Sequence, residues 1–75
     1  MSDRLPSLKA RDVEKALLQM GFYPVRQKGS HVFFKHEDGR TTLVPRHGGE
    51  EIGRGLVRQI LREIQLTPEE FSKYL

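Results

Sequence analysis

The chain has 75 residues, a length typical of one small domain, and 31% of its residues are charged. It contains no cysteine, which excludes disulfide bridges and thiolate metal ligands. Lysine and arginine number 13 against 10 aspartate and glutamate, so the formal net charge is +3. No apolar run reaches the length of a membrane helix, and the first residues lack the apolar core of a secretory signal. We therefore expect one cytoplasmic domain, residues 1–75, without a membrane segment.

A first helix is predicted over residues 10–20. Four apolar residues recur at the spacing of one helix face, namely Val13, Ala16, Leu17 and Met20. Gly21 follows as the C-cap, and Phe22 can pack back over the helix end. Residues 1–8 before this helix are expected to be a loose lead-in.

Three short strands are predicted next, in an antiparallel meander. They span Phe22–Gln27, Ser30–His36 and Arg40–Pro45. The first turn is Lys28-Gly29-Ser30, and the second contains Asp38-Gly39, a pair that favours hairpin turns. Pro24 indicates that the first strand lies at a sheet edge, because proline has no N–H to donate.

A flexible loop over residues 47–51 leads to two further helices. The first runs from about residue 53 to 65, with one apolar face formed by Leu56, Val57, Ile60, Leu61 and Ile64. The second, over residues 68–74, begins with a capping box made by Thr67 and Glu70, with Pro68 at its first position. The order αβββα plus a short helix predicts an α+β fold in which helices cover one sheet face, as in the double-stranded-RNA-binding domain (dsRBD).

The basic side chains are concentrated in the middle of the chain. Between residues 26 and 46 lie five cations and two histidines, against two acidic residues: Arg26, Lys28, Lys35, Arg40 and Arg46, with His31 and His36, against Glu37 and Asp38. The basic character therefore belongs to the middle of the chain, while the net charge alone favours a polyanionic partner only slightly.

Several segments, in this order and spacing, resemble the HicA (YcfA-like) mRNA interferase family. They are Gly21-Phe22, residues 26–34 with Gly29-Ser30-His31 at their centre, Asp38-Gly39, Val44-Pro45-Arg46-His47 and residues 51–55. The resemblance extends over residues 9–72. One local departure is Lys9, because the family often places serine at this helix entry, where the cap contributes about 1 kcal/mol.

The resemblance implies a dsRBD-like toxin of a type II toxin–antitoxin system. Its expected activity is ribosome-independent cleavage of mRNA, with the histidine after Gly-Ser, here His31, as the catalytic residue. The expected partner is a HicB-type antitoxin protein that covers the active site, and the free toxin is expected to be a monomer.

The residue types fit cleavage of RNA without a metal ion. A histidine transfers protons near neutral pH, and RNA supplies its own nucleophile in the 2′-hydroxyl. Judged by residue type alone, His31 is equally a catalytic group or a surface histidine without a role. The three histidines lack a metal-ligand spacing, so we expect neither metal nor cofactor.

The residues around His31 are candidates for RNA binding, and each has a plainer interpretation. Lys28 can bind a phosphate, or it is an ordinary turn residue whose side chain is solvated. Gly29 allows a ligand to approach the backbone. Ser30 can donate to a phosphate or stabilise its own turn. Arg46 and His47 follow the third strand and are candidate RNA contacts. His47 is a candidate second proton-transfer group or phosphate contact, or else a loop histidine without a role. His36 is expected to be a surface residue.

Alternation along the second strand places His31, Phe33 and Lys35 on one sheet face and Val32, Phe34 and His36 on the other. If His31 faces outward, Phe34 is in the core and Phe33 is exposed, where it can stack on a base or contact a protein partner. A stripe of Arg54, Arg58 and Arg62 on the later helix is expected to be solvated, the alternatives being contact with RNA or with an acidic antitoxin surface.

Two other functions compete with that of a ribonuclease toxin. One is a non-catalytic RNA-binding module of the same fold, and the other is a protein-interaction domain. Gly29-Ser30-His31 discriminates between them, because a binding module does not need a titrating histidine there. A protein adaptor would not need the neighbouring Lys28, Lys35 and Arg46.

Overall fold

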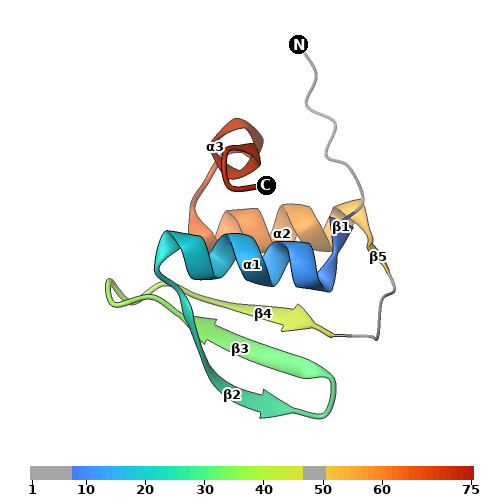
Figure 1. Ribbon diagram of the computed structural model, residues 1–75, viewed down its shortest axis with the longest axis vertical. Helices are drawn as coiled ribbons and strands as arrows, with labels where there is room; N and C mark the ends of the chain where they lie inside the picture. Colours follow the sequence, from blue (N-terminus) through green and yellow to red (C-terminus); the bar gives the residue numbers. More distant parts are fainter. Residues whose placement is uncertain (1–7, 47–50) are drawn as a thin grey trace.

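The computed structural model describes residues 8–46 and 51–75. In chain order the elements are β1 (Leu8–Lys9), α1 (Ala10–Met20), β2 (Tyr23–Lys28), β3 (His31–Lys35), β4 (Thr41–Pro45), β5 (Glu51–Ile52), α2 (Arg54–Ile64) and α3 (Pro68–Ser72) (Figure 1). An antiparallel sheet of three strands has the order β2-β3-β4. The α+β, dsRBD-like αβββα fold with a short C-terminal helix is therefore confirmed.

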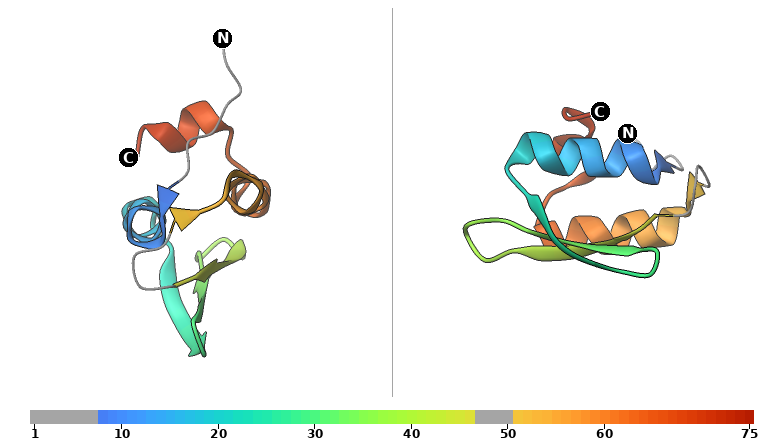
Figure 2. Two further views of the ribbon diagram at one scale, coloured as in Figure 1. Left: turned by 90° about the vertical axis from the view of Figure 1, so that its right-hand side faces the viewer. Right: turned by 60° about the horizontal axis from the view of Figure 1, so that its bottom comes forward.

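The two long helices lie on the same side of the sheet, and α3 packs beyond them (Figure 2). The core between helices and sheet contains buried residues of both layers: Val13, Ala16 and Leu17 of α1, Val57, Ile60, Leu61 and Ile64 of α2, and Val32, Phe34 and Val44 of the sheet. Strand β2 projects beyond this cover, and its six residues are all exposed. No helix within the described residues covers the other sheet face (Figure 2).

Helix α1 ends where the sequence predicts. Gly21 has a left-handed φ of 102°, and its N–H donates to Leu18 O while the N–H of Phe22 donates to Leu17 O. These two bonds are the Schellman arrangement, which satisfies carbonyl groups left without partners at a helix end. Phe22, only 2% exposed, closes the core beneath this cap.

A small two-stranded pair, β1 with β5, was not predicted. Leu8 lies opposite Ile52 and Lys9 opposite Glu51, antiparallel, so the segment before α1 is tied to the segment before α2. Residue 8 was expected in a loose lead-in and residue 51 in a loop. Strands of two residues are too short to carry a period-two pattern, so sequence periodicity cannot reveal them.

The turn between β3 and β4 holds the C-terminal ends of both long helices. The His36 Nε2 lies 3.2 Å from Met20 O at the end of α1, and Arg40 donates to Ile64 O at the end of α2. Both side chains also contact the Phe22 ring, His36 edge-on with ring centroids 5.0 Å apart and Arg40 with its guanidinium carbon 5.1 Å from the ring centroid.

The expectation that His36 is a surface residue is therefore wrong. The side chain is half-buried, and its Nδ1 accepts a hydrogen bond of 3.1 Å from the N–H of Asp38. In the tautomer that carries its proton on Nε2, the ring donates to Met20 O. His36 is a structural residue that caps α1 from the hairpin.

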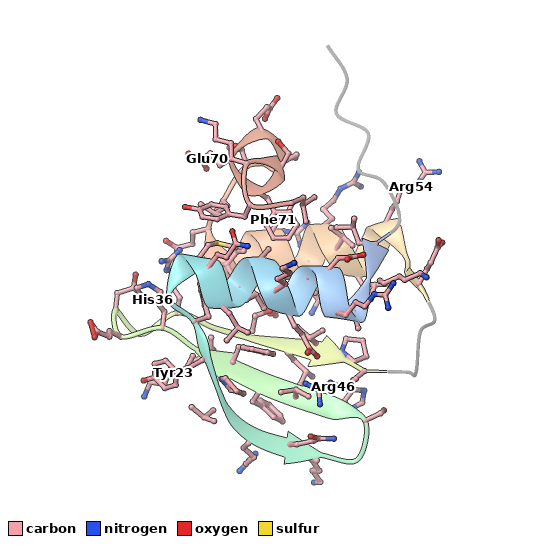
Figure 3. All side chains as sticks on the ribbon, in the orientation of Figure 1. Tyr23, His36, Arg46, Arg54, Glu70 and Phe71 are labelled. Atoms are coloured by element: carbon pink, nitrogen blue, oxygen red, sulfur yellow. The ribbon has the colours of Figure 1, made fainter. Side chains whose placement is uncertain are left out.

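Helix α2 carries its three arginines on an exposed face, Arg54, Arg58 and Arg62, and Figure 3 shows Arg54 pointing away from the sheet. Helix α3 begins with the predicted capping box, in which the N–H of Thr67 donates to Glu70 Oε1 and the N–H of Glu70 donates to Thr67 Oγ1. Its Phe71 is buried. None of the helices within residues 8–46 and 51–75 has the length and apolarity that crossing a membrane requires.

Candidate active site

The helix-free face of the sheet presents three rows of side chains. In an antiparallel sheet, directly paired residues of neighbouring strands point to the same face. The pairing places on this face Lys28, His31 and Pro45 in one row, Arg26, Phe33 and Leu43 in the next, and Tyr23, Lys35 and Thr41 in the third. The predicted alternation of β3 is confirmed, since Val32 and Phe34 are each 2% exposed while His31 and Lys35 are exposed.

A β-bulge in β2 decides which of its side chains join this face. The register shifts between Pro24 and Arg26, so Val25 is the extra residue on the edge strand. In a strand without the bulge, strict alternation would place Val25 and Gln27 on the same face as Tyr23. Arg26 and Lys28 would then point to the opposite face. The bulge reverses this order beyond residue 25, as bulges do where they re-aim side chains. Both cations therefore lie on the face of His31.

A two-residue hairpin turn positions His31 at the start of β3. Gly29 has a φ of 60° at the first turn position, as a type II′ turn requires, and an added Cβ there would meet no atom within 4 Å. Glycine is therefore required by the backbone conformation. The carbonyl of Ser30 accepts a hydrogen bond from the N–H of Arg46, which ties the turn to the end of β4. His31 itself is exposed, with its ring on the open face.

Two lysines flank His31. Lys28 is its direct cross-strand partner, at a spacing that brings Cβ atoms to about 4.5–5.5 Å. Lys35 lies four residues along β3 on the same face, about 13 Å away. Both are exposed. An anion that contacts the His31 ring therefore has a lysine ammonium group within reach on one side and a second along the strand.

Phe33 lies on the open face, as predicted, but its ring is half-buried. The guanidinium carbon of Arg26, its direct cross-strand partner, lies 4.9 Å from the ring centroid. This is the distance range of a cation–π contact. The exposed surface at the centre of the face is therefore an arginine lying over a phenylalanine.

The third row and the free edge of β4 extend the face. Tyr23, paired with Lys35 and 43% exposed, is visible at the start of β2 (Figure 3). A shallow hollow beside Phe33 is lined by Thr41, Thr42, Leu43 and Glu63. The hydroxyl of Thr42 donates to the Glu63 carboxylate at 2.8 Å, which joins the edge strand to α2.

Arg46 follows β4, and its side chain is engaged by α1. Its Nε and Nη2 donate to the two carboxylate oxygens of Glu14 at 3.0 and 2.8 Å. The hydrogen bonds that Arg46 donates to Glu14, and then the negative charge of Glu14, raise the pKa of Arg46 above its ordinary value. The guanidinium therefore has a structural partner at the position where the sequence predicts a phosphate contact.

The structure brings together six of the residues predicted for the site, on one hairpin: Lys28, Gly29, Ser30, His31, Phe33 and Lys35. His47 lies outside the described residues. Sequence reasoning missed Arg26 and Tyr23 as members of this face, because their orientation depends on the bulge. Within the described part of the chain, no three His, Cys, Asp or Glu side chains form a group that could hold a metal ion.

Comparison with protein families identifies the family of this chain. The family model described as the HicA toxin of bacterial toxin–antitoxin systems matches residues 10–66, which is more than half of the chain and contains the whole three-stranded sheet. No curated protein matches the chain.

Proposed function

Because the chain belongs to the HicA toxin family of bacterial toxin–antitoxin systems, we propose that it is a metal-independent endoribonuclease that cleaves mRNA in the cytoplasm, with His31 as its catalytic acid–base. The observation that carries the proposal is the exposed imidazole of His31 on the open sheet face, with Lys28 directly beside it. When the RNA's own 2′-hydroxyl is the nucleophile, an imidazole can accept its proton, and an ammonium group can stabilise the negative charge that develops on the phosphate.

The reaction proceeds by attack of the 2′-oxygen on the adjacent phosphorus. His31 takes the 2′-hydroxyl proton as the new P–O bond forms, which is general-base catalysis worth about 10²–10⁴ in rate. Lys28 stabilises the negative charge that develops on the phosphoryl oxygens. The bond from phosphorus to the 5′-oxygen then breaks, and that oxygen takes a proton. The products are a 2′,3′-cyclic phosphate and a 5′-hydroxyl end.

Two groups that donate a proton are candidates for the second transfer. One is the imidazolium that His31 becomes after the first step, and the other is His47, which lies outside the described residues. Lys35 and the backbone at Gly29 and Ser30 bind the phosphates on either side of the cleaved bond.

Cleavage of a labelled single-stranded RNA by the purified protein tests this proposal. We expect cleavage to persist in EDTA and to stop when a 2′-deoxynucleotide replaces the nucleotide at the cleaved position. Mass spectrometry of the fragments should find the cyclic phosphate. Loss of activity on chelation, or equal cleavage of the 2′-deoxy substrate, would overturn the mechanism. Binding without cleavage would instead indicate a non-catalytic RNA-binding module.

We also propose that the free toxin is a monomer and that a HicB-type antitoxin protein neutralises it by covering the open face. Half-buried apolar side chains, Phe33, Leu43 and Pro45, lie between the cations on that face and give a protein partner an apolar centre to cover. In a complex with its antitoxin, hydrogen exchange should slow at the β2–β3 hairpin around His31. Protection confined to the helical side would refute this binding mode.

A further inference from the structure

Arg26 occupies an unusual place on the open face. It is an exposed cation, yet it lies over the ring of Phe33 with its guanidinium carbon 4.9 Å from the centroid. Two separate features bring it there, the bulge at Val25, which turns it to this face, and its direct pairing with Phe33 across the strands. The outermost planar surface in the middle row is therefore the guanidinium group and not the phenyl ring.

A planar guanidinium does two things that an ammonium group cannot. It stacks against π-faces, and it is weakly hydrated, so a flat apolar surface displaces its water easily. Single-stranded RNA is recognised mainly by stacking of splayed bases on aromatic rings or arginine planes. Phosphate binding needs only positive charge, which Lys28 and Lys35 already supply on this face. The plane held by Phe33 adds a surface suited to a base.

The position fits the nucleotide next to the cleaved phosphate. Phe33 is two residues from His31 on the same face, a separation of about 6.5 Å along a strand. An RNA strand that follows β3, with one phosphate at His31 and Lys28, therefore brings the next base over Arg26.

We propose that Arg26, supported by the Phe33 ring, is a stacking subsite for the nucleobase that neighbours the cleaved phosphate. This inference rests on the proposed ribonuclease function, because it assumes that RNA binds the face of His31. Arg26 acts on binding and register of the substrate, so it is a positioning residue, and the chemical step remains with His31.

The test compares a charge-conserving variant with its parent, on RNA with and without bases. The parent carries His31→Ala so that the RNA stays intact, and Arg26→Lys is added to it, with Arg11→Lys as a matched control on the exposed side of α1. Fluorescence anisotropy measures binding to a labelled random-sequence RNA 12-mer and to an abasic ribose-phosphate strand of equal length. Both titrations are repeated at several salt concentrations.

Stacking predicts that Arg26→Lys weakens binding to the RNA by roughly 5- to 150-fold, the range for loss of one stacked base. The salt dependence should keep its slope, because the charge is retained. On the abasic strand, Arg26→Lys and its parent should bind alike, and Arg11→Lys should match the parent throughout. Phe33→Leu should cause a similar loss, and the double variant should lose little more than either single one.

Equal binding of Arg26→Lys and its parent to the RNA would overturn the inference and leave the proposed function intact. A loss of the same size on the abasic strand would also overturn it, since it would make Arg26 a phosphate contact. Absence of RNA binding by the parent, together with absence of cleavage by the protein with His31 in place, would refute both the inference and the proposed function.

Discussion

Replacing Phe33 or Phe34 by alanine should have different effects on stability and on RNA binding, because the two side chains lie on opposite faces of β3. Phe34 is 2% exposed in the core, and loss of a buried phenyl ring costs about 3–5 kcal/mol in the free energy of unfolding. A domain of this length has roughly 4–11 kcal/mol in total, so Phe34→Ala should leave much of the protein unfolded at growth temperature. Phe33 is half-buried under Arg26, and its removal should cost about 1 kcal/mol.

Thermal unfolding followed by circular dichroism measures this difference. At about 4–8 °C per kcal/mol for a domain of this size, Phe33→Ala should lower the Tm by less than about 8 °C and Phe34→Ala by more than about 12 °C. At a temperature low enough for both variants to be folded, binding of a labelled RNA should change in the opposite order, because Phe33→Ala removes a side chain of the open face and Phe34→Ala does not. If Phe33→Ala lowers the Tm as much as Phe34→Ala does, the assignment of the two faces is wrong.

The hairpin and the ion pair of α1 give three further predictions. His36→Ala should lower the free energy of unfolding by about 1–3 kcal/mol in urea titrations, because Met20 O loses its partner; an unchanged midpoint would contradict this role. The backbone N–H of Arg40, and then its guanidinium, lower the pKa of Asp38, so the folded state binds this proton more weakly than the unfolded state. The stabilisation is present above about pH 4 and is lost as the pH falls further, and urea titrations between pH 7 and pH 3 should show less acid destabilisation for Asp38→Asn. Glu14→Gln should cost at most about 1 kcal/mol of stability and, by releasing the Arg46 guanidinium, strengthen RNA binding at low salt; weaker binding would show that Glu14 holds Arg46 in its binding position.

Local patterns in the sequence predict the helices and the inner and outer sides of β3. The apolar spacing and Gly21 determine α1, and alternation of His31, Phe33 and Lys35 determines the open face. These features depend on residues close together in the chain, where backbone geometry and burial act directly.

Other features arise only from tertiary contacts. The bulge at Val25 reverses the orientation of Arg26, and nothing in the alternating pattern of that segment marks where the extra residue lies. The contact of His36 with Met20 joins residues that are 16 positions apart, and that of Arg46 with Glu14 joins residues 32 apart. Residue type alone indicates a surface histidine at position 36, and the folded chain supplies a partner that the sequence does not display. The predicted phosphate contact of Arg46 stays a prediction, and its ion pair with Glu14 is likewise absent from any local pattern.

The central claim is that His31 carries the chemistry while its neighbours bind the RNA. The most direct measurement is the single-turnover cleavage rate of purified His31→Ala on a labelled RNA, with its Tm and RNA affinity determined on the same preparation. We predict a rate lower by about 10²–10⁴, a Tm within a few degrees of the unmodified protein, since exposed substitutions cost within about 0.5 kcal/mol, and an affinity that is largely retained. Cleavage by folded His31→Ala at the rate of the unmodified protein would contradict the account.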